Sequence, residues 1–262
     1  MDSMFTVRLR GKFRVLQIAL LVVWLPAGVQ AAQADAIAQG EKIVTGGSAQ
    51  GAPACVGCHG ANGEGNADFP RLAGTGSAYL AAQLNAFASG ERKNSIMQQF
   101  AQKLTPEERT AVAAYYGQLT APSAVRRNPV APAPADLGGW LATRGRWSDQ
   151  LPACAQCHGM DGGGVGDQFP PLAGLSENYI REQLKAWKVQ SRPPGPLGLM
   201  PVVAGKLSDT DVTAVAQYYA SLLNRAKAGA SQGTVATSPS ASGQIMPKKD
   251  ASPREVPNDK AQ

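Results

Sequence analysis

The chain has 262 residues, with four cysteines, two histidines, six methionines and a formal net charge of +6. The positive excess lies at the two ends, because residues 1–34 hold four bases and one acid and residues 225–262 hold six bases and three acids. Residues 35–224 therefore carry no net charge, which excludes the basic footprint of a nucleic-acid-binding protein. About 228 residues follow position 34, enough for two small domains.

Residues 1–34 have the pattern of a secretory signal peptide. Four basic residues precede an apolar run from Val15 to Leu25, and small residues with Ala32-Gln33-Ala34 as a cleavage site follow. The alternative is an uncleaved membrane anchor, although the apolar run is shorter than the roughly 20 residues that a spanning helix requires. We therefore expect export to the periplasm, with membrane association as the alternative.

The remainder of the chain contains an internal repeat, in which the offset between matched residues rises from 99 to 103. The matched pairs are Cys55 with Cys154, Pro70 with Pro170, Tyr79 with Tyr179, Met97 with Met200, and Tyr115 with Tyr218. We interpret residues 35–120 and 136–224 as two copies of one domain. Residues 121–135 contain four prolines without apolar periodicity, as in a stiff linker. Residues 225–262 are expected to be a disordered tail, with tethering to a partner or an anionic membrane as its alternative role.

Both copies are expected to be all-helical, and no segment has the pattern of a strand. Two matched helix faces are predicted from apolar and large side chains at helical spacing: Tyr79, Leu80, Gln83, Leu84 and Phe87 in the first half, and Tyr179, Ile180, Gln183, Leu184 and Trp187 in the second. Capping boxes at Thr105 and Ser208 predict a further helix in each half. Gly40 and Gly139 each lie fifteen residues before a cysteine, where we expect a short helix to approach its terminal partner closely.

Each half contains one C-x-x-C-H sequence, and the two copies use every cysteine and histidine in the chain. Such a sequence is the signature of c-type haem attachment. Two thiols three residues apart can add to the two vinyl groups of one haem, while the adjacent imidazole reaches the iron. We expect two covalently attached haem c groups. The expected thioether residues are Cys55, Cys58, Cys154 and Cys157, and the expected iron ligands are His59 and His158.

Three other uses of these cysteines explain the pattern less well. A structural zinc site needs about four ligands, whereas each motif offers three, with the histidine directly beside the second cysteine. A thioredoxin-like pair is expected beside a strand-helix-strand pattern, and no run of β-branched residues precedes either motif. Two disulfides, the usual interpretation of paired cysteines in an exported protein, would leave both histidines without a role.

A methionine is the expected sixth iron ligand in each half, since the histidines are already used. Met97 and Met200 occupy equivalent positions in the repeat, whereas Met160 follows His158 too closely to reach the opposite face of the haem. A lone methionine is usually a core gap-filler, but the shared register favours ligation. His/Met coordination leaves the iron no open position. We therefore expect an electron-transfer protein, with no catalytic residues and no small-molecule substrate.

These motifs, in this order and twice over, resemble the two-haem class I cytochromes of the cytochrome c4 family. The likeness covers about residues 35–224 and includes Phe-Pro-x-Leu-Ala-Gly and Tyr-x-x-x-Gln-Leu in both halves. It implies two all-helical domains, each wrapped around one haem, packed pseudo-symmetrically so that the haem edges approach. It also implies that the carbonyl groups of Pro70 and Pro170 hydrogen-bond to the ligating imidazoles. Gln98, which replaces a proline after Met97, departs from the family pattern.

Our interpretation is a periplasmic carrier that takes electrons singly from a quinol-oxidising bc complex or a dehydrogenase and passes them to a terminal oxidase or reductase. Its partners would be redox proteins of the respiratory chain, bound through small transient interfaces. A second hypothesis is a dedicated cytochrome subunit of a periplasmic dehydrogenase or reductase. A third is a two-haem peroxidase or sulfur-compound oxidoreductase, which would need one iron with an open position.

Overall fold

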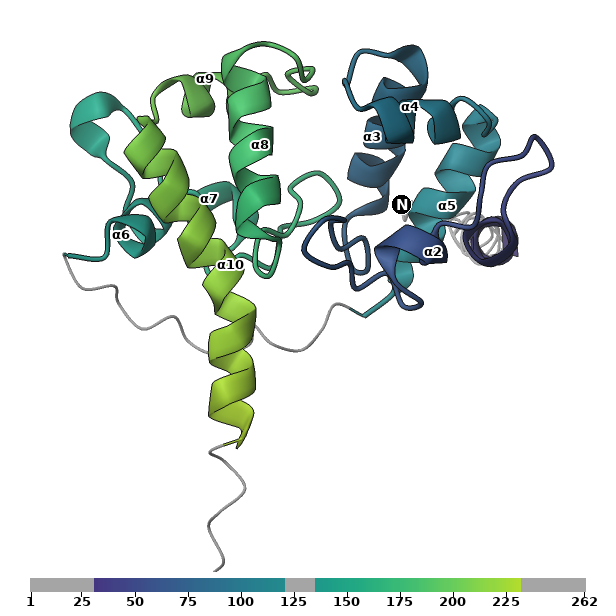
Figure 1. The fold of residues 1–262 in the computed structure, drawn as a ribbon, viewed down its shortest axis with the longest axis horizontal. Coiled ribbons are helices and arrows are strands. Elements are labelled where there is room, and N and C mark those ends of the chain that lie inside the picture. The colour runs from purple at the N-terminus through teal and green to yellow at the C-terminus, as the bar shows by residue number, and fades with distance from the viewer. Residues whose placement is uncertain (1–30, 121–134, 232–262) are drawn as a thin grey trace, which may run out of the picture.

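The computed structural model describes residues 31–120 and 135–231, which form two helical domains side by side (Figure 1). The first domain comprises a helix over residues 31–46, α2 (Val56–His59), α3 (Ser77–Ser89), α4 (Ser95–Ala101) and α5 (Pro106–Gln118). The second comprises α6 (Leu137–Thr143), the 3-10 helix η1 (Trp147–Asp149), α7 (Ala155–His158), α8 (Glu177–Lys188), α9 (Leu199–Gly205) and α10 (Asp209–Ser231). In these two ranges, strand-like pairing is limited to two isolated bridges. The expected all-α fold is confirmed.

Three of the expected segments lie mostly outside the described residues: the signal peptide of residues 1–34, the linker of residues 121–135 and the tail of residues 225–262. One correction is needed where the tail begins, because α10 continues to Ser231 and residues 225–231 are therefore helical. Alanine, lysine and arginine in this stretch are good helix formers, and extending a helix costs less than starting one. No helix within residues 31–120 and 135–231 is long and apolar enough to cross a membrane.

The first helix of each domain crosses the last helix at a glycine. A Cβ atom on Gly40 would lie 2.1 Å from the carbonyl oxygen of Ala111 in α5, and one on Gly138 would lie 2.2 Å from that of Ala214 in α10. The sequence prediction had placed the second contact at Gly139. It was wrong by one position, because the second domain has one more residue between this helix and its first cysteine.

The capping boxes predicted for α5 and α10 are both present. The hydroxyl of Thr105 accepts a hydrogen bond from the Glu108 backbone N–H at 3.2 Å, and the Glu108 carboxylate accepts one from the Thr105 N–H at 2.8 Å. Ser208 and Asp211 repeat this exchange at 3.1 and 2.8 Å. These contacts satisfy the free N–H groups of the first turn and fix where each terminal helix begins.

α3 and α8 lie next to each other where the two domains meet (Figure 1), and a reciprocal set of hydrogen bonds joins them. Arg92 of the first domain donates to the hydroxyl group of Tyr179 at 3.1 Å, and Arg192 of the second donates to that of Tyr79 at 2.6 Å. Each guanidinium also donates to a glutamine of the opposite domain, at 2.7 and 3.1 Å respectively. These glutamines are Gln183 and Gln83.

Substitution of Gly138 by alanine should lower the free energy of unfolding by about 1 to 3 kcal/mol, because the added Cβ overlaps the Ala214 carbonyl group. Gly205→Ala is a matched control, since a Cβ there meets nothing within 4 Å, and it should be neutral or slightly stabilising. Urea denaturation of both variants measures the difference. Parental stability of Gly138→Ala would contradict the close crossing.

The ion pair between Arg146 and Asp211 should make stability depend on acid pH. The guanidinium donates to the carboxylate at 2.8 Å, and this bond holds the pKa of Asp211 at about 2, against burial, which raises it. A depressed pKa contributes stability above the ordinary value of 3.8, and the contribution disappears as the pH falls through about 2. Asp211→Asn should therefore cost on the order of 2 kcal/mol at pH 7. In denaturation curves this deficit should shrink between about pH 4 and 2, and a deficit independent of pH would contradict the assignment.

Candidate haem sites

In each domain the C-x-x-C-H sequence forms one helical turn that ends in a buried histidine. His59 ends α2 and His158 ends α7, and each is 7% exposed. The next residues, Gly60 and Gly159, have φ values of +87° and +82°, a conformation that favours glycine and stops the helix. All four cysteines are half-buried and none forms a disulfide, so both pairs are available for thioether formation.

One ring nitrogen of each histidine is committed to a proline carbonyl group. Nδ1 of His59 lies 2.9 Å from the carbonyl oxygen of Pro70, and Nδ1 of His158 lies 2.8 Å from that of Pro170. Because a carbonyl oxygen can only accept, Nδ1 carries the proton and Nε2 keeps the lone pair. Burial lowers the pKa of both imidazoles, against the opposing effect of these hydrogen bonds. Both rings are therefore neutral at pH 7 with Nε2 able to bind a metal, and each is oriented by the contact that the family resemblance implied.

The loop from each histidine to its proline is folded back onto the ring. In the first domain the Gly65 N–H donates to the His59 carbonyl at 2.8 Å, and Gly164 donates to His158 at the same distance. A phenylalanine immediately before each proline meets the imidazole edge-on, with ring centroids 6.0 Å apart in the first domain and 6.4 Å apart in the second. These contacts hold the imidazole, its carbonyl acceptor and the cysteine turn as one unit.

The first thiol of each motif does not have the lowered pKa of a reactive redox cysteine. Burial raises the pKa of Cys55 and of Cys154 to about 11. A thioredoxin-like site needs a cysteine whose pKa is lowered, because the thiolate is the nucleophile. The raised pKa of these two thiols is the opposite of that property, which argues against the thioredoxin-like alternative.

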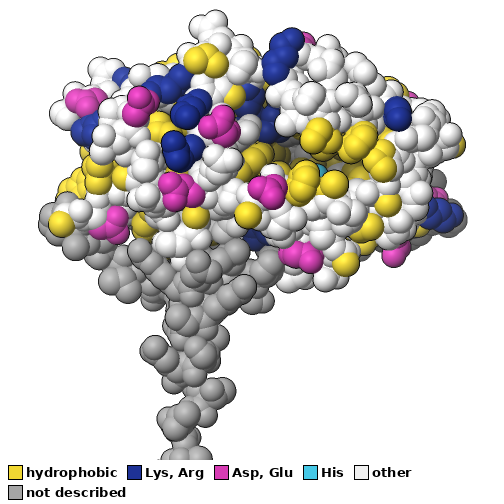
Figure 2. Space-filling model, viewed as in Figure 1, with side chains coloured by type: hydrophobic (Ala, Val, Ile, Leu, Met, Phe, Trp, Pro, Cys, Tyr) yellow, Lys and Arg dark blue, Asp and Glu magenta, His cyan; other side chains and the backbone are white. Residues whose placement is uncertain are grey.

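The two candidate methionine ligands lie at the start of matched helices. Met97 is in the first turn of α4 and Met200 in the first turn of α9, and both are half-buried. Met200 packs against the core of the second domain, whereas Met160 is 59% exposed. Figure 2 shows a recess bordered by hydrophobic side chains, in which a histidine is visible.

Buried cations provide a test of whether a haem fits these domains. Arg71, Arg92 and Arg192 are 5 to 6% exposed. None of the three has a carboxylate partner within the described ranges, and Nε of Arg71 has no hydrogen-bond partner at all there. Burial lowers the pKa of Arg71 and of Arg192. Since buried charges are normally paired, a cofactor that carries carboxylates, as haem does, suits this environment.

Sequence reasoning missed the arginines at the domain contact. It assigned Tyr79 and Gln83 to a helix face without a partner in the other domain. A signal was present, because Arg92 and Arg192 recur at an offset of 100, each shortly after a Tyr-x-x-x-Gln helix. Each guanidinium also lies over an aromatic ring of its own domain, 4.4 Å from the centroid of Phe87 and 3.9 Å from that of Trp187.

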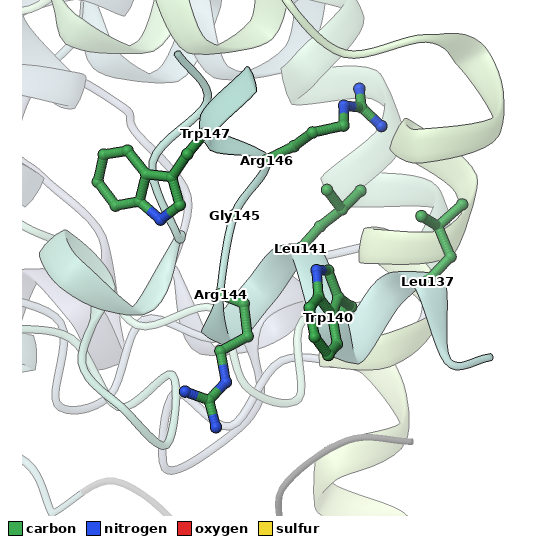
Figure 3. Close-up of a pocket in the computed structure, with 7 residues that line it drawn as sticks. All are labelled: Leu137, Trp140, Leu141, Arg144, Gly145, Arg146 and Trp147. Carbon is green, nitrogen blue, oxygen red and sulfur yellow. The ribbon is translucent and has the colours of Figure 1, made fainter. Parts of the chain in front are cut away.

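A separate surface hollow of about 580 Å³ lies on the second domain, beside α6 (Figure 3). Its lining residues are Leu137, Trp140, Leu141, Arg144, Gly145, Arg146 and Trp147. They include no cysteine, histidine or methionine. When Gly40 is aligned with Gly138, the first domain has Lys42 in place of Trp140 and Gly46 in place of Arg144, so the hollow does not belong to the repeated haem sites.

Comparison with known proteins agrees with this geometry. The family model described as Cytochrome c matches residues 37–120 and 149–223. The protein named thiosulfate dehydrogenase electron acceptor from Stutzerimonas stutzeri is 45% identical over 208 residues, which cover 76% of this chain and 94% of that protein. Cytochrome c4 from Pseudomonas aeruginosa is 31% identical over 207 residues, which cover 78% of this chain and 96% of that protein.

A solved structure of thiosulfate dehydrogenase (TsdBA) from Marichromatium purpuratum matches with a TM-score of 0.63 and 42% identity. The match covers 70% of this chain but only 40% of that longer one. The family model matches both halves of the chain, and the match to the two electron-transfer relatives covers nearly the whole length of each relative. The chain therefore belongs to the cytochrome c family. It is an electron-transfer cytochrome of the two-haem c4 type, with haem c bound covalently at Cys55/Cys58 and at Cys154/Cys157.

Proposed function

We propose that this dihaem cytochrome is exported to the periplasm, accepts electrons from an enzyme of the thiosulfate dehydrogenase type and passes them to a terminal oxidase or reductase. The proposal rests on a difference in sequence identity between two relatives. The chain is 45% identical to a protein named as the electron acceptor of that enzyme and 31% identical to a cytochrome c4. Export is proposed from the leader pattern of residues 1–34.

The number of redox sites suits such a donor. Each bound haem supplies an iron that takes up one electron. Oxidative joining of two thiosulfate ions through a sulfur–sulfur bond releases two electrons, and one chain with two haems can accept both. With such a donor, the first two hypotheses from the sequence agree. A cytochrome that is dedicated to one dehydrogenase is also a carrier that passes electrons on to a respiratory acceptor.

The protein residues would determine the properties of each iron. We propose that His59 and His158 bind iron through Nε2, with the proline carbonyl groups increasing the basicity of the imidazoles. Met97 and Met200 are proposed as the opposite ligands, supported by their matched positions and half-buried side chains. The buried guanidinium groups, Arg71 among them, would hold haem carboxylates. Ligation by a methionine sulfur raises the reduction potential of the iron and leaves it no open position for a small molecule.

Substitution of either methionine should open one haem only. Met97→Ala or Met200→Ala is expected to produce a high-spin haem that binds added cyanide or carbon monoxide, while the other haem keeps its methionine-to-iron charge-transfer band. Optical and magnetic spectra of the purified holoprotein measure this. Met160→Ala is the matched control, because that side chain is 59% exposed, and its spectrum should equal that of the parent. An unchanged spectrum in Met97→Ala and Met200→Ala would remove the ligand assignment.

Thiosulfate should reduce the oxidised holoprotein rapidly when a catalytic amount of a thiosulfate dehydrogenase is present, and only slowly without it. Stopped-flow absorbance of the haem bands measures the rate. Because residues 35–224 have no net charge, we expect little electrostatic steering of the encounter by these residues. The rate should therefore change less than about threefold between low and physiological ionic strength. If dithionite reduces the protein while the enzyme with thiosulfate does not, the proposed donor is wrong.

A further inference from the structure

Helix α3 of the first domain begins without a capping side chain of its own. Its N-cap residue is Gly76, which offers no side-chain acceptor. The matched helix α8 has Ser176 at this position, and the serine hydroxyl accepts a hydrogen bond from the Tyr179 N–H at 3.1 Å. Because the first N–H groups of a helix have no acceptor within the helix, α3 needs one from elsewhere.

Asp167 of the second domain supplies this acceptor. Its carboxylate accepts a hydrogen bond from the Ala78 N–H at 2.9 Å, and its backbone carbonyl accepts one from the Tyr79 N–H at 3.0 Å. The hydroxyl of Ser77 donates to the same carboxylate at 3.1 and 3.2 Å. A negative charge at a helix N-terminus is also favoured by the helix dipole. One residue of the second domain thus satisfies the first turn of a helix in the first.

The contact depends on a glycine in the first domain. A Cβ atom on Gly76 would lie 2.4 Å from the carbonyl oxygen of Asp167 and 2.7 Å from its Cα. Any side chain at this position would therefore push the two backbones apart. The contact is also one-way, because at an offset of 100 the residue that matches Asp167 is Ala67 and the residue that matches Gly76 is Ser176.

Asp167 lies in the loop that carries the imidazole contacts of the second haem site. Val165 and Phe169 pair across a short turn, with N–H to carbonyl distances of 3.0 and 3.3 Å, and Asp167 lies between them. Phe169 in turn meets the ring of His158 edge-on. This turn therefore connects the histidine environment of the second domain directly to α3 of the first.

We propose that Asp167 is a positioning residue for electron exchange between the two haems, because it caps α3 across the domain contact and thereby holds the second haem domain in one orientation on the first. The proposal rests on the two-haem electron-transfer function. The reciprocal arginine contacts run in both directions and reach side chains in the first and second turns of α3 and α8. The Asp167 cap runs one way, to backbone N–H groups in the first turn of α3. Loss of the cap leaves the domains joined but able to rock about the arginine contacts.

The test is the rate of electron exchange between the haems in half-reduced holoprotein, measured by flash photolysis, together with the magnetic coupling between the two oxidised haems. Asp167→Ala should slow exchange by roughly threefold to tenfold, because loss of one helix cap lowers the population of the aligned domain arrangement by a factor of that order. Gly76→Ala should slow exchange at least as much. Asp167→Asn should retain a rate near that of the parent, since asparagine caps as well as aspartate. The separate midpoint potentials should stay unchanged in all three variants.

Two controls separate positioning from a general effect of substitution. Gln168→Ala changes the exposed neighbour of Asp167, and Gly46→Ala adds a Cβ that meets nothing within 4 Å, so both should exchange electrons at the parental rate. Hydrogen exchange at the start of α3 should rise in Asp167→Ala, and it reports the cap whether or not the redox function is correct. Parental exchange rates and coupling in both Asp167→Ala and Gly76→Ala would overturn the proposal.

Discussion

The hydrogen bond from each histidine Nδ1 to a proline carbonyl is the contact on which the rest of the structure depends. It fixes the ring tautomer and orientation, and it joins the C-x-x-C-H turn to the Phe-Pro loop. That loop is tied in turn to the terminal helix, because the N–H groups of Gly74 and Gly174 donate to the carbonyl groups of Tyr116 and Tyr219 at 3.0 Å. The glycine crossing with the first helix completes a closed framework around each cysteine pair.

The two frameworks are joined by contacts of different symmetry. The arginine, tyrosine and glutamine bonds obey the repeat, so that each domain gives and receives the same interactions. The Asp167 contact breaks the repeat and runs in one direction only. The two domains thus dock through residues that both copies share, and Asp167, which only the second copy has, adds a contact in one direction. The buried guanidinium groups at the shared contact place positive charge between the domains.

Local signals explain why much of this could be predicted from the sequence. The cysteine motifs, the helix faces and the capping boxes each depend on residues a few positions apart, and the helices appear where those patterns predicted them. The close crossing was assigned to Gly139 instead of Gly138, because a fixed spacing does not register an inserted residue. The cap from Asp167 could not be predicted, since it joins segments about 90 residues apart through backbone geometry. Methionine ligation remains a prediction.

The most direct test of the central claim is mass spectrometry of the intact protein and of its peptides, after export from a host that attaches haem to C-x-x-C-H motifs. The account predicts a mass equal to the polypeptide plus two haems, with one haem on the peptide that contains Cys55 and one on the peptide that contains Cys154. A polypeptide without haem, or haem on only one of the two peptides, would contradict it.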